Sequence, residues 1–368
     1  MPVNVINGTN GTNGASHSTI SRPLTPGIFA PIPTFFLADS EDLDVPTFEA
    51  HIVRLANAGV RPLIAGSMGE AIHLSHEERI TLIKAGRKAL DAAGHTTMPI
   101  IAGTGAGSTR ETIQLTKQAA DAGADYAIVI ASGYFAGALT RPALKAFWAE
   151  VSSKSPIPVL IYNCVYNNSA WISDSDSGPA DPGASGGIDL DSDIITELAE
   201  EYPNLAGVKL TCGNVGKLTR ICSVVSQSSF AKEHPRKNAD APFLVFGGFA
   251  DFILTSTFVN GHGAIIGLAN VAPHAAVKLF NLSHQSLQEE SLLPEAQRLQ
   301  GIIAQGDFTI AKTSISGTKD LLQKLYGYGG LPRKPLPPAD PSVVSALWEH
   351  PHVKALVQAE KEAGGKFI

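Results

Sequence analysis

The chain has few cysteines and little charge, and it has no long apolar run. Its three cysteines are odd in number and widely spaced among 368 residues, which excludes a disulfide framework and fits a reducing compartment. Charged residues make up 17% and the net charge is −6, so the sequence lacks the basic surface that attracts nucleic acids or anionic membranes. No stretch approaches the roughly 18 consecutive apolar residues of a membrane-spanning helix. We therefore expect a protein that acts on small molecules, without nucleic-acid or membrane partners.

The N-terminal segment is rich in glycine, asparagine, threonine and serine. Its first twenty residues contain neither the apolar core of a secretory signal nor the arginines of a transit peptide. We expect residues 1–22 to form a disordered tail and the protein to reside in the cytoplasm.

From residue 23 onward, short apolar runs alternate with amphipathic helical patterns. Strands are predicted at Gly27–Ile32, Pro62–Ala65, Pro99–Ala102, Tyr126–Ile130, Val159–Tyr162, Ala206–Lys209, Phe243–Phe246 and Ala264–Ile266. Helical patterns lie between them at Val45–Ala58, His76–Ala93, Thr109–Ala122, Arg141–Val151, Asp191–Glu200, Val215–Ser226 and Phe249–Asn260. Such alternation implies a parallel sheet, either a closed barrel or an open doubly wound sheet. The strand count favours an α/β fold of the (β/α)8 TIM-barrel type, and no GxGxxG motif follows the first strand to favour a dinucleotide-binding sheet.

We assign residues 23–285 to the barrel and residues 286–368 to a C-terminal helical extension. A turn-rich loop at 167–187 interrupts the regular spacing, and it is much longer than a typical strand-to-helix connection.

In a parallel barrel, functional groups gather at the carboxyl ends of the strands. Lys209 ends the apolar strand LAGVKL, where lost hydration would lower its pKa and free a nucleophilic amine; a snorkelling or salt-bridged lysine is the alternative. Tyr162 ends the preceding strand and is either a proton shuttle or a core tyrosine. Ser67 precedes a Gly-Glu pair and either helps to hold a carboxylate or caps a helix.

Other polar residues at the strand ends are interpreted as structural. Glu70 is expected in a first helical turn as a capping or dipole partner. His73 and His76 lie close in sequence, but no HExxH or His-x-His pattern with carboxylate partners surrounds them, so no metal site is predicted. Cys164 and Cys212 are interpreted as packing residues.

Several segments, taken in order, resemble motifs of the dihydrodipicolinate synthase / N-acetylneuraminate lyase family. They are GSMGE, AGTGAGSTRETIQLTKQAADAGAD, IYN, GVKLTCGN and GHGAIIGLANVAP, and the resemblance runs from about Pro23 to Gln300. It implies a (β/α)8 barrel with added C-terminal helices, usually tetrameric, that needs neither a metal nor an organic cofactor.

The resemblance also implies roles for individual residues. Lys209 would form an imine with the C2 carbonyl of pyruvate or a larger 2-oxo acid. Tyr162 would shuttle protons and orient the substrate. Ser67 would relay protons and, with the backbone amides of Ser67 and Met68, hold the substrate carboxylate. Tyr134 matches a family tyrosine that often reaches into a neighbouring subunit's site, and Ile265 matches a residue whose carbonyl lies near the lysine.

The chain departs from the family pattern at three positions. Met68 replaces the second hydroxyl of the signature, and Val165 replaces a proline. Asn167 stands where dihydrodipicolinate synthases carry the arginine that binds the second substrate's carboxylate. Loss of such a charge-assisted pair disfavours the condensation of lysine biosynthesis.

We therefore expect a class I aldolase that cleaves a 4-hydroxy-2-oxo acid to pyruvate, or a related 2-oxo acid, and an aldehyde. Its substrate would be 4-hydroxy-2-oxoglutarate or a 2-keto-3-deoxy sugar acid, and it would form a homo-oligomer (tetramer or dimer). A dihydrodipicolinate synthase-like condensation, a sugar-acid dehydratase using the same imine, a catalytically silent binding barrel and a metal-dependent aldolase are the alternatives.

Overall fold

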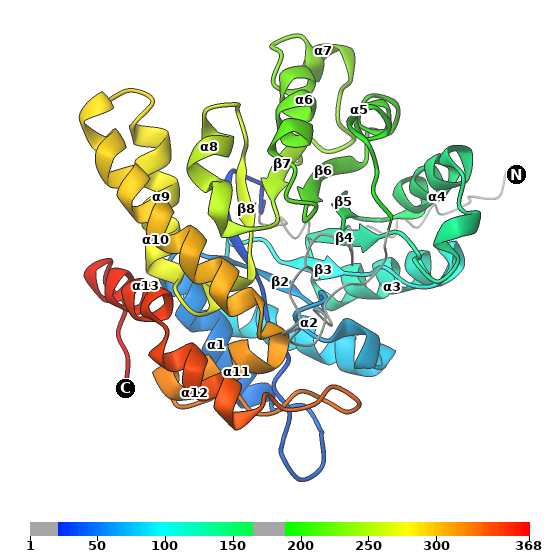
Figure 1. Ribbon diagram of the computed structural model, residues 1–368. Helices are drawn as coiled ribbons and strands as arrows, with labels where there is room; N and C mark the ends of the chain where they lie inside the picture. Colours follow the sequence, from blue (N-terminus) through cyan, green and yellow to red (C-terminus); the bar gives the residue numbers. More distant parts are fainter. Residues whose placement is uncertain (1–20, 165–187) are drawn as a thin grey trace, which may run out of the picture.

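The computed structural model of the protein describes residues 21–164 and 188–368, so most of the predicted tail, the predicted loop 167–187, Val165 and Asn167 lie outside the described residues. Parallel strands close into a barrel in the sequence order β1 to β8 (Figure 1). Their bounds are β1 Gly27–Pro31, β2 Arg61–Ile64, β3 Ile101–Gly103, β4 Tyr126–Ile130, β5 Val159–Asn163, β6 Leu205–Leu210, β7 Leu244–Gly247 and β8 Gly263–Ile265. The predicted (β/α)8 barrel is confirmed, and each predicted strand overlaps an observed one.

Helices surround the barrel on its outside (Figure 1). They are α1 Val45–Asn57, α2 His76–Ala92, α3 Thr109–Ala122, α4 Arg141–Lys154, α5 Ser192–Glu201, α6 Val215–Val225, α7 Phe230–Glu233, α8 Ile253–Thr257 and α9 Pro273–Gln285. Several begin at a side chain that accepts a hydrogen bond from the first turn, among them Asp44, Ser75, Ser108 and Asn214. The helix predicted at Phe249–Asn260 is shorter than expected, because its first residues form the 3₁₀ helix η3 at Ala250–Phe252.

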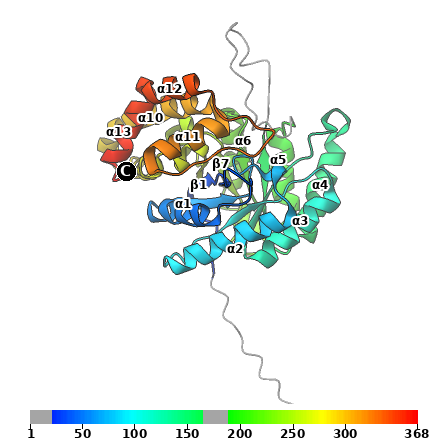
Figure 2. The same cartoon turned by 90° about the horizontal axis from the view of Figure 1, so that it is seen from below.

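The C-terminal extension consists of α10 Leu293–Ala311, α11 Ser314–Tyr326, α12 Pro341–Glu349 and α13 Pro351–Glu362. These helices gather on one side of the barrel (Figure 2). Leu321 and Leu322 of α11 and Leu356 of α13 belong to the same buried apolar cluster as Phe48 and Ile52 of α1. The extension therefore shares a hydrophobic core with the outer helices. Within the described ranges, no helix combines the length and the apolar character needed to cross a bilayer.

The barrel interior is filled by a separate apolar cluster. Its buried members are Leu24, Phe29, Leu63, Ile101, Tyr126, Ile128, Leu160, Ala206, Ala241, Leu244, Phe246 and Ile265. The rings of Phe29 and Phe246 meet edge to face, with their centroids 5.3 Å apart. Close packing of the interior leaves the carboxyl ends of the strands as the place where polar side chains can meet a ligand.

Candidate active site

Lys209 and Tyr162 lie side by side at the carboxyl ends of β6 and β5. The two residues are direct partners in the strand register, and Phe246 of β7 is the partner of Lys209 on its other side. The Lys209 Nζ lies 4.3 Å from the centroid of the Tyr162 ring. The structure thus brings together the two residues that the sequence predicts for the chemistry.

The environment of Lys209 favours its uncharged form. The residue is 6% exposed, and burial lowers the pKa of its ammonium to about 8, against an ordinary value of 10.5, while negative charge on the nearby Cys164 would act in the opposite direction. The described part of the chain buries two other lysines, Lys217 and Lys319, and each has a carboxylate partner, Asp189 and Glu70 respectively. Among described residues, no carboxylate lies within salt-bridge distance of Lys209. This buried amine is therefore suited to nucleophilic attack.

A pH profile tests the state of this amine. Because the pKa of Lys209 is lowered in the folded protein, the nucleophilic form is present above about pH 8 and is lost as the pH falls below that value. We expect the rate of imine formation with pyruvate, measured by borohydride trapping at subsaturating pyruvate, to rise with pH and level off above about 8. A rate that keeps rising until the ordinary lysine value of 10.5 would contradict the lowered pKa.

The surroundings of Tyr162 favour the protonated form of its phenol. Burial raises the pKa of its phenol, a nearby charge on Cys164 would raise it further, and the neighbouring hydroxyls of Thr211 and Ser67 partly offset the shift. Ser67 belongs to the connection after β2, so the β2, β5 and β6 ends meet at this phenol. A protonated tyrosine beside an amine can donate a proton and recover one through neighbouring hydroxyls.

The loop of Ser67 has a tightly constrained backbone. Ala65 and Glu70, on either side of Gly66–Gly69, both adopt left-handed conformations, with φ of 54° and 52°. A side chain at Gly69 would come within 2.8 Å of the Ile32 carbonyl oxygen, so only glycine fits there. The capping interpretation of Ser67 is wrong, because Ser75 caps α2. The capping role predicted for Glu70 is also wrong, because its carboxylate caps no helix and instead pairs with Lys319.

Met68 and Ile265 lie at different depths of the barrel end. A side chain at Gly267 would come within 3.0 Å of the Met68 methyl group, so Met68 reaches the connection after β8. Ile265 is buried within β8 and belongs to the interior cluster. The roles of the Met68 amide and the Ile265 carbonyl in substrate binding stay predictions.

Tyr134 is not placed at this site by the described chain. Its side chain lies in the connection after β4 and is 89% exposed, and its ring packs edge to face on Phe135, with centroids 4.9 Å apart. A role for Tyr134 in proton transfer therefore requires another subunit, and it stays a prediction.

Thr211 is a candidate site residue that the sequence analysis missed. Its hydroxyl is buried and, within residues 21–164 and 188–368, has no full hydrogen bond, although it neighbours the phenol of Tyr162. Gly248 leaves room for it, because a side chain there would approach the Thr211 Oγ1 to 2.3 Å. Buried hydroxyls normally have a partner, so a bound substrate is a suitable one. The sequence signal for Thr211 was its spacing. Residues two apart on a strand point to the same side, so Thr211 is expected on the same side as Lys209.

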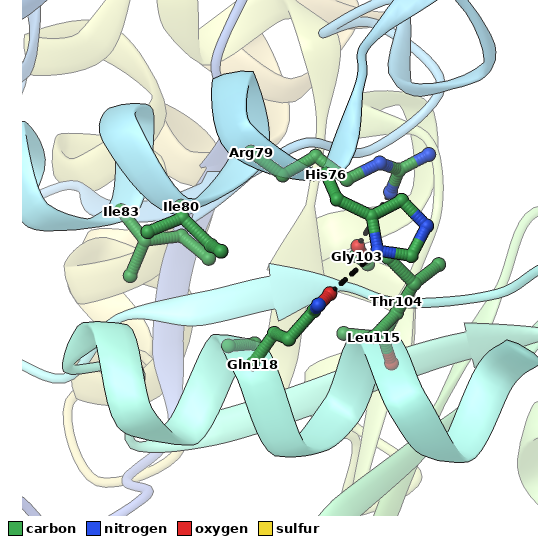
Figure 3. Close-up of a pocket in the computed structure, with 9 residues that line it drawn as sticks. His76, Arg79, Ile80, Ile83, Gly103, Thr104, Leu115 and Gln118 are labelled. Carbon is green, nitrogen blue, oxygen red and sulfur yellow. Dashed lines mark hydrogen bonds between the residues drawn. The ribbon is translucent and has the colours of Figure 1, made fainter.

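A small cavity lies outside the barrel, between α2 and α3 (Figure 3). His76, Arg79 and Gln118 help to line it, and the His76 Nδ1 lies 2.8 Å from the Gln118 Oε1. Its volume of about 10 Å³ is enough for only one water molecule. His76 also contacts Glu111 at 2.6 Å, so its ring is part of a helix-to-helix contact.

Comparisons with known proteins agree with the barrel fold. A model of the dihydrodipicolinate synthetase family matches residues 25–172. The chain is 39% identical over 324 residues to an L-threo-3-deoxy-hexylosonate aldolase of Hypocrea jecorina, covering 88% of this chain and 94% of the relative. It is 42% identical over 330 residues to a probable mitochondrial 4-hydroxy-2-oxoglutarate aldolase of Emericella nidulans, covering 89% of this chain and 94% of the relative.

A solved structure gives the same assignment. A putative dihydrodipicolinate synthase family protein from Coccidioides immitis superimposes with a TM-score of 0.72 and 31% identity, over 94% of this chain and 99% of that one. The family resemblance predicted from the motifs is confirmed. The chain belongs to the dihydrodipicolinate synthetase family.

Proposed function

We propose that the chain is a class I aldolase, which cleaves a 4-hydroxy-2-oxo acid to pyruvate, or a related 2-oxo acid, and an aldehyde. One observation carries the proposal: a buried lysine with a pKa near 8, which has no carboxylate partner among residues 21–164 and 188–368, lies against a protonated tyrosine at the barrel mouth. The aldolase names of the Hypocrea and Emericella relatives support it.

The chemistry follows from the two side chains. The neutral Lys209 amine attacks the C2 carbonyl, and the carbinolamine takes up one proton from solvent and loses its hydroxyl as water, which leaves a protonated imine. When the C3–C4 bond breaks, its electron pair moves into the imine and gives an enamine, while the C4 hydroxyl gives up its proton. Tyr162 accepts that proton as it passes its own to Ser67, and Ser67 passes one on through Tyr134 of the neighbouring subunit to solvent, so no phenolate accumulates; the same relay run in reverse supplies the proton for C3. Protonation of the enamine at C3 and hydrolysis of the imine release the 2-oxo acid and restore the amine.

Charge at the barrel mouth favours a sugar acid over 4-hydroxy-2-oxoglutarate. The sequence contains no lysine or arginine in the connections from each strand to the next helix, which are residues 32–44, 65–75, 104–108, 131–140, 164–191, 211–214, 248–252 and 266–272. Their single histidine, His73, contacts the Glu70 carboxylate at 3.3 Å. These connections offer a second substrate carboxylate no lysine or arginine of their own to offset its lost hydration, whereas hydroxyls on an uncharged aldehyde half need only hydrogen bonds.

Pyruvate release from a panel of substrates tests this function. We expect a 2-keto-3-deoxy sugar acid to have a higher kcat/KM than 4-hydroxy-2-oxoglutarate. The analogue 4-hydroxy-2-oxopentanoate, with a methyl group in place of the second carboxylate, isolates the effect of charge. A clear preference for 4-hydroxy-2-oxoglutarate would contradict the sugar-acid assignment but keep the aldolase. Loss of water without pyruvate release would establish the dehydratase. Condensation of pyruvate with an amino aldehyde to a product that closes into a ring, which the reverse aldolase reaction does not give, would establish the synthase-like alternative.

We also propose a homo-oligomer, tetramer or dimer, in which Tyr134 acts in a neighbouring subunit's site. The exposed Tyr134–Phe135 pair supports this, because contiguous exposed aromatic rings are typical of interfaces. Sedimentation of the native protein and of a Tyr134→Ala/Phe135→Ala variant tests the proposed assembly. We expect the native protein to sediment as an oligomer and the variant as a smaller species, and a monomeric native protein would contradict the proposal. The cytoplasmic location stays a prediction from the sequence.

A further inference from the structure

A carboxylate deep in the protein ties the Ser67 loop to the C-terminal extension. Glu70 Oε1 accepts a hydrogen bond from the Lys319 Nζ of α11 at 2.6 Å. Glu70 Oε2 accepts one from the backbone N–H of Arg333 at 2.8 Å. Both of these partners come from the C-terminal extension, while a third contact, from His73 Nδ1 to Oε2 at 3.3 Å, lies within the loop itself. The loop that follows β2 is thus held from outside the barrel, by residues more than 200 positions later in the chain.

This ion pair is completely buried and well satisfied. The side chains of Glu70 and Lys319 are both 0% exposed. Lys319 also donates to the Leu331 carbonyl oxygen at 2.9 Å, and its Nζ lies 4.8 Å from the centroid of the Phe36 ring. Removal of one partner from such a pair leaves an uncompensated buried charge, so each partner strongly fixes the place of the other.

The position of Glu70 is transmitted directly to Ser67. The Glu70 N–H donates to the Ser67 carbonyl oxygen at 3.0 Å, and Thr34 Oγ1 donates to the Gly69 carbonyl oxygen at 2.7 Å. Glu70 itself holds a left-handed conformation, which non-glycine residues keep only where their surroundings enforce it. The side-chain partners in the C-terminal extension supply that enforcement.

We infer that Glu70 and Lys319 are positioning residues for the substrate carboxylate. By holding the left-handed turn at Glu70, the α11 lysine sets the orientation of the Ser67 hydroxyl and of the Ser67 and Met68 amides. Neither residue of the pair touches the substrate. The inference rests on the proposed function, in which this loop binds the carboxylate of a 2-oxo acid.

The kinetic signature of such a role is a change in KM rather than in kcat. Carboxylate contacts contribute to ground-state and transition-state binding alike, so their loss weakens binding without slowing the bound reaction to the same degree. We expect Lys319→Met to raise the KM of the 2-oxo acid by about tenfold or more, since small misplacements of a binding group have effects of this order. Glu70→Gln keeps an oxygen acceptor, and it is expected to raise KM less.

Glu360→Gln provides a matched control. Glu360 of α13 is also buried, and it accepts hydrogen bonds from the Nδ1 of His274 at 2.7 Å and from the backbone N–H of Ala275 at 2.7 Å. Its loss disturbs the packing of the extension without a contact to the Ser67 loop. We expect this variant to be less heat-stable and to keep its KM.

The experiment combines steady-state kinetics with borohydride trapping at saturating pyruvate. Labelling of Lys319→Met at saturation, together with a raised KM, supports the inference. An unchanged KM in folded Lys319→Met and Glu70→Gln, or an equal rise in Glu360→Gln, overturns it. Should Lys319→Met fail to fold, Glu70→Gln carries the comparison alone. If the native protein itself is not labelled, the proposed function is overturned. Failure of the inference, by contrast, is seen only in the variants, while the native protein is still labelled.

Discussion

Lys209→Ala is expected to abolish pyruvate release, with a fall in kcat on the order of 10⁴-fold or more, the scale seen when a covalent nucleophile is removed. Without the amine, no imine forms, and the electron pair of the breaking C3–C4 bond has no acceptor. The Tyr162 phenol and the Ser67 loop stay in place but have no covalent intermediate on which to act. The barrel itself should fold, because the variant removes a buried, partly charged group from an apolar interior.

Mass spectrometry after borohydride reduction with pyruvate measures this directly. The native protein should gain one reduced pyruvate adduct on Lys209, and the variant should gain none. Lys217→Met is the control, because Lys217 is another buried lysine but donates to Asp189 and to the Leu190 carbonyl oxygen. It should label normally. An adduct on Lys209→Ala would mean that another amine is the nucleophile.

Tyr162→Phe is expected to lower kcat by about 10² to 10⁴-fold, the usual contribution of one positioned acid or base. The phenyl ring stays against Lys209, so imine trapping at saturating pyruvate should persist while cleavage slows. This separates a proton-transfer role from a role in holding the lysine.

Tyr126→Phe is the matched control for that variant. Tyr126 is a buried tyrosine of β4 whose hydroxyl donates to the carbonyl oxygens of Arg22 and Asp240, at 3.0 and 3.2 Å. Its loss should lower the melting temperature and leave kcat near the native value. Near-native kcat in Tyr162→Phe, or a comparable loss of kcat in Tyr126→Phe, would remove Tyr162 from the mechanism.

Local patterns explain why the barrel and its central pair were predictable. Each strand is a short apolar run followed by a turn, and neighbouring strands in a closed barrel are also neighbours in sequence. Because Tyr162 and Lys209 both end such runs, their adjacency followed from the order of strands alone.

Long-range contacts explain what was missed. No local pattern relates Glu70 to Lys319, so the sequence suggested a helix cap where the structure has a buried ion pair. The spacing of Thr211 from Lys209 was readable in the sequence, but the residue was overlooked because its significance lies in a buried hydroxyl that has no full partner among the described residues, and only packing reveals that. The exposure of Tyr134 likewise depends on how the connection after β4 leaves the barrel.

The Glu70–Lys319 contact has a consequence for biosynthesis. The two residues are 249 positions apart, and a ribosome adding roughly 5–20 residues per second needs about 12 to 50 s to travel between them. During that interval the strands of the barrel can pair, but the turn at Glu70 has no lysine to hold it. A nascent chain should therefore reach its full 2-oxo acid affinity only after α11 has emerged and docked.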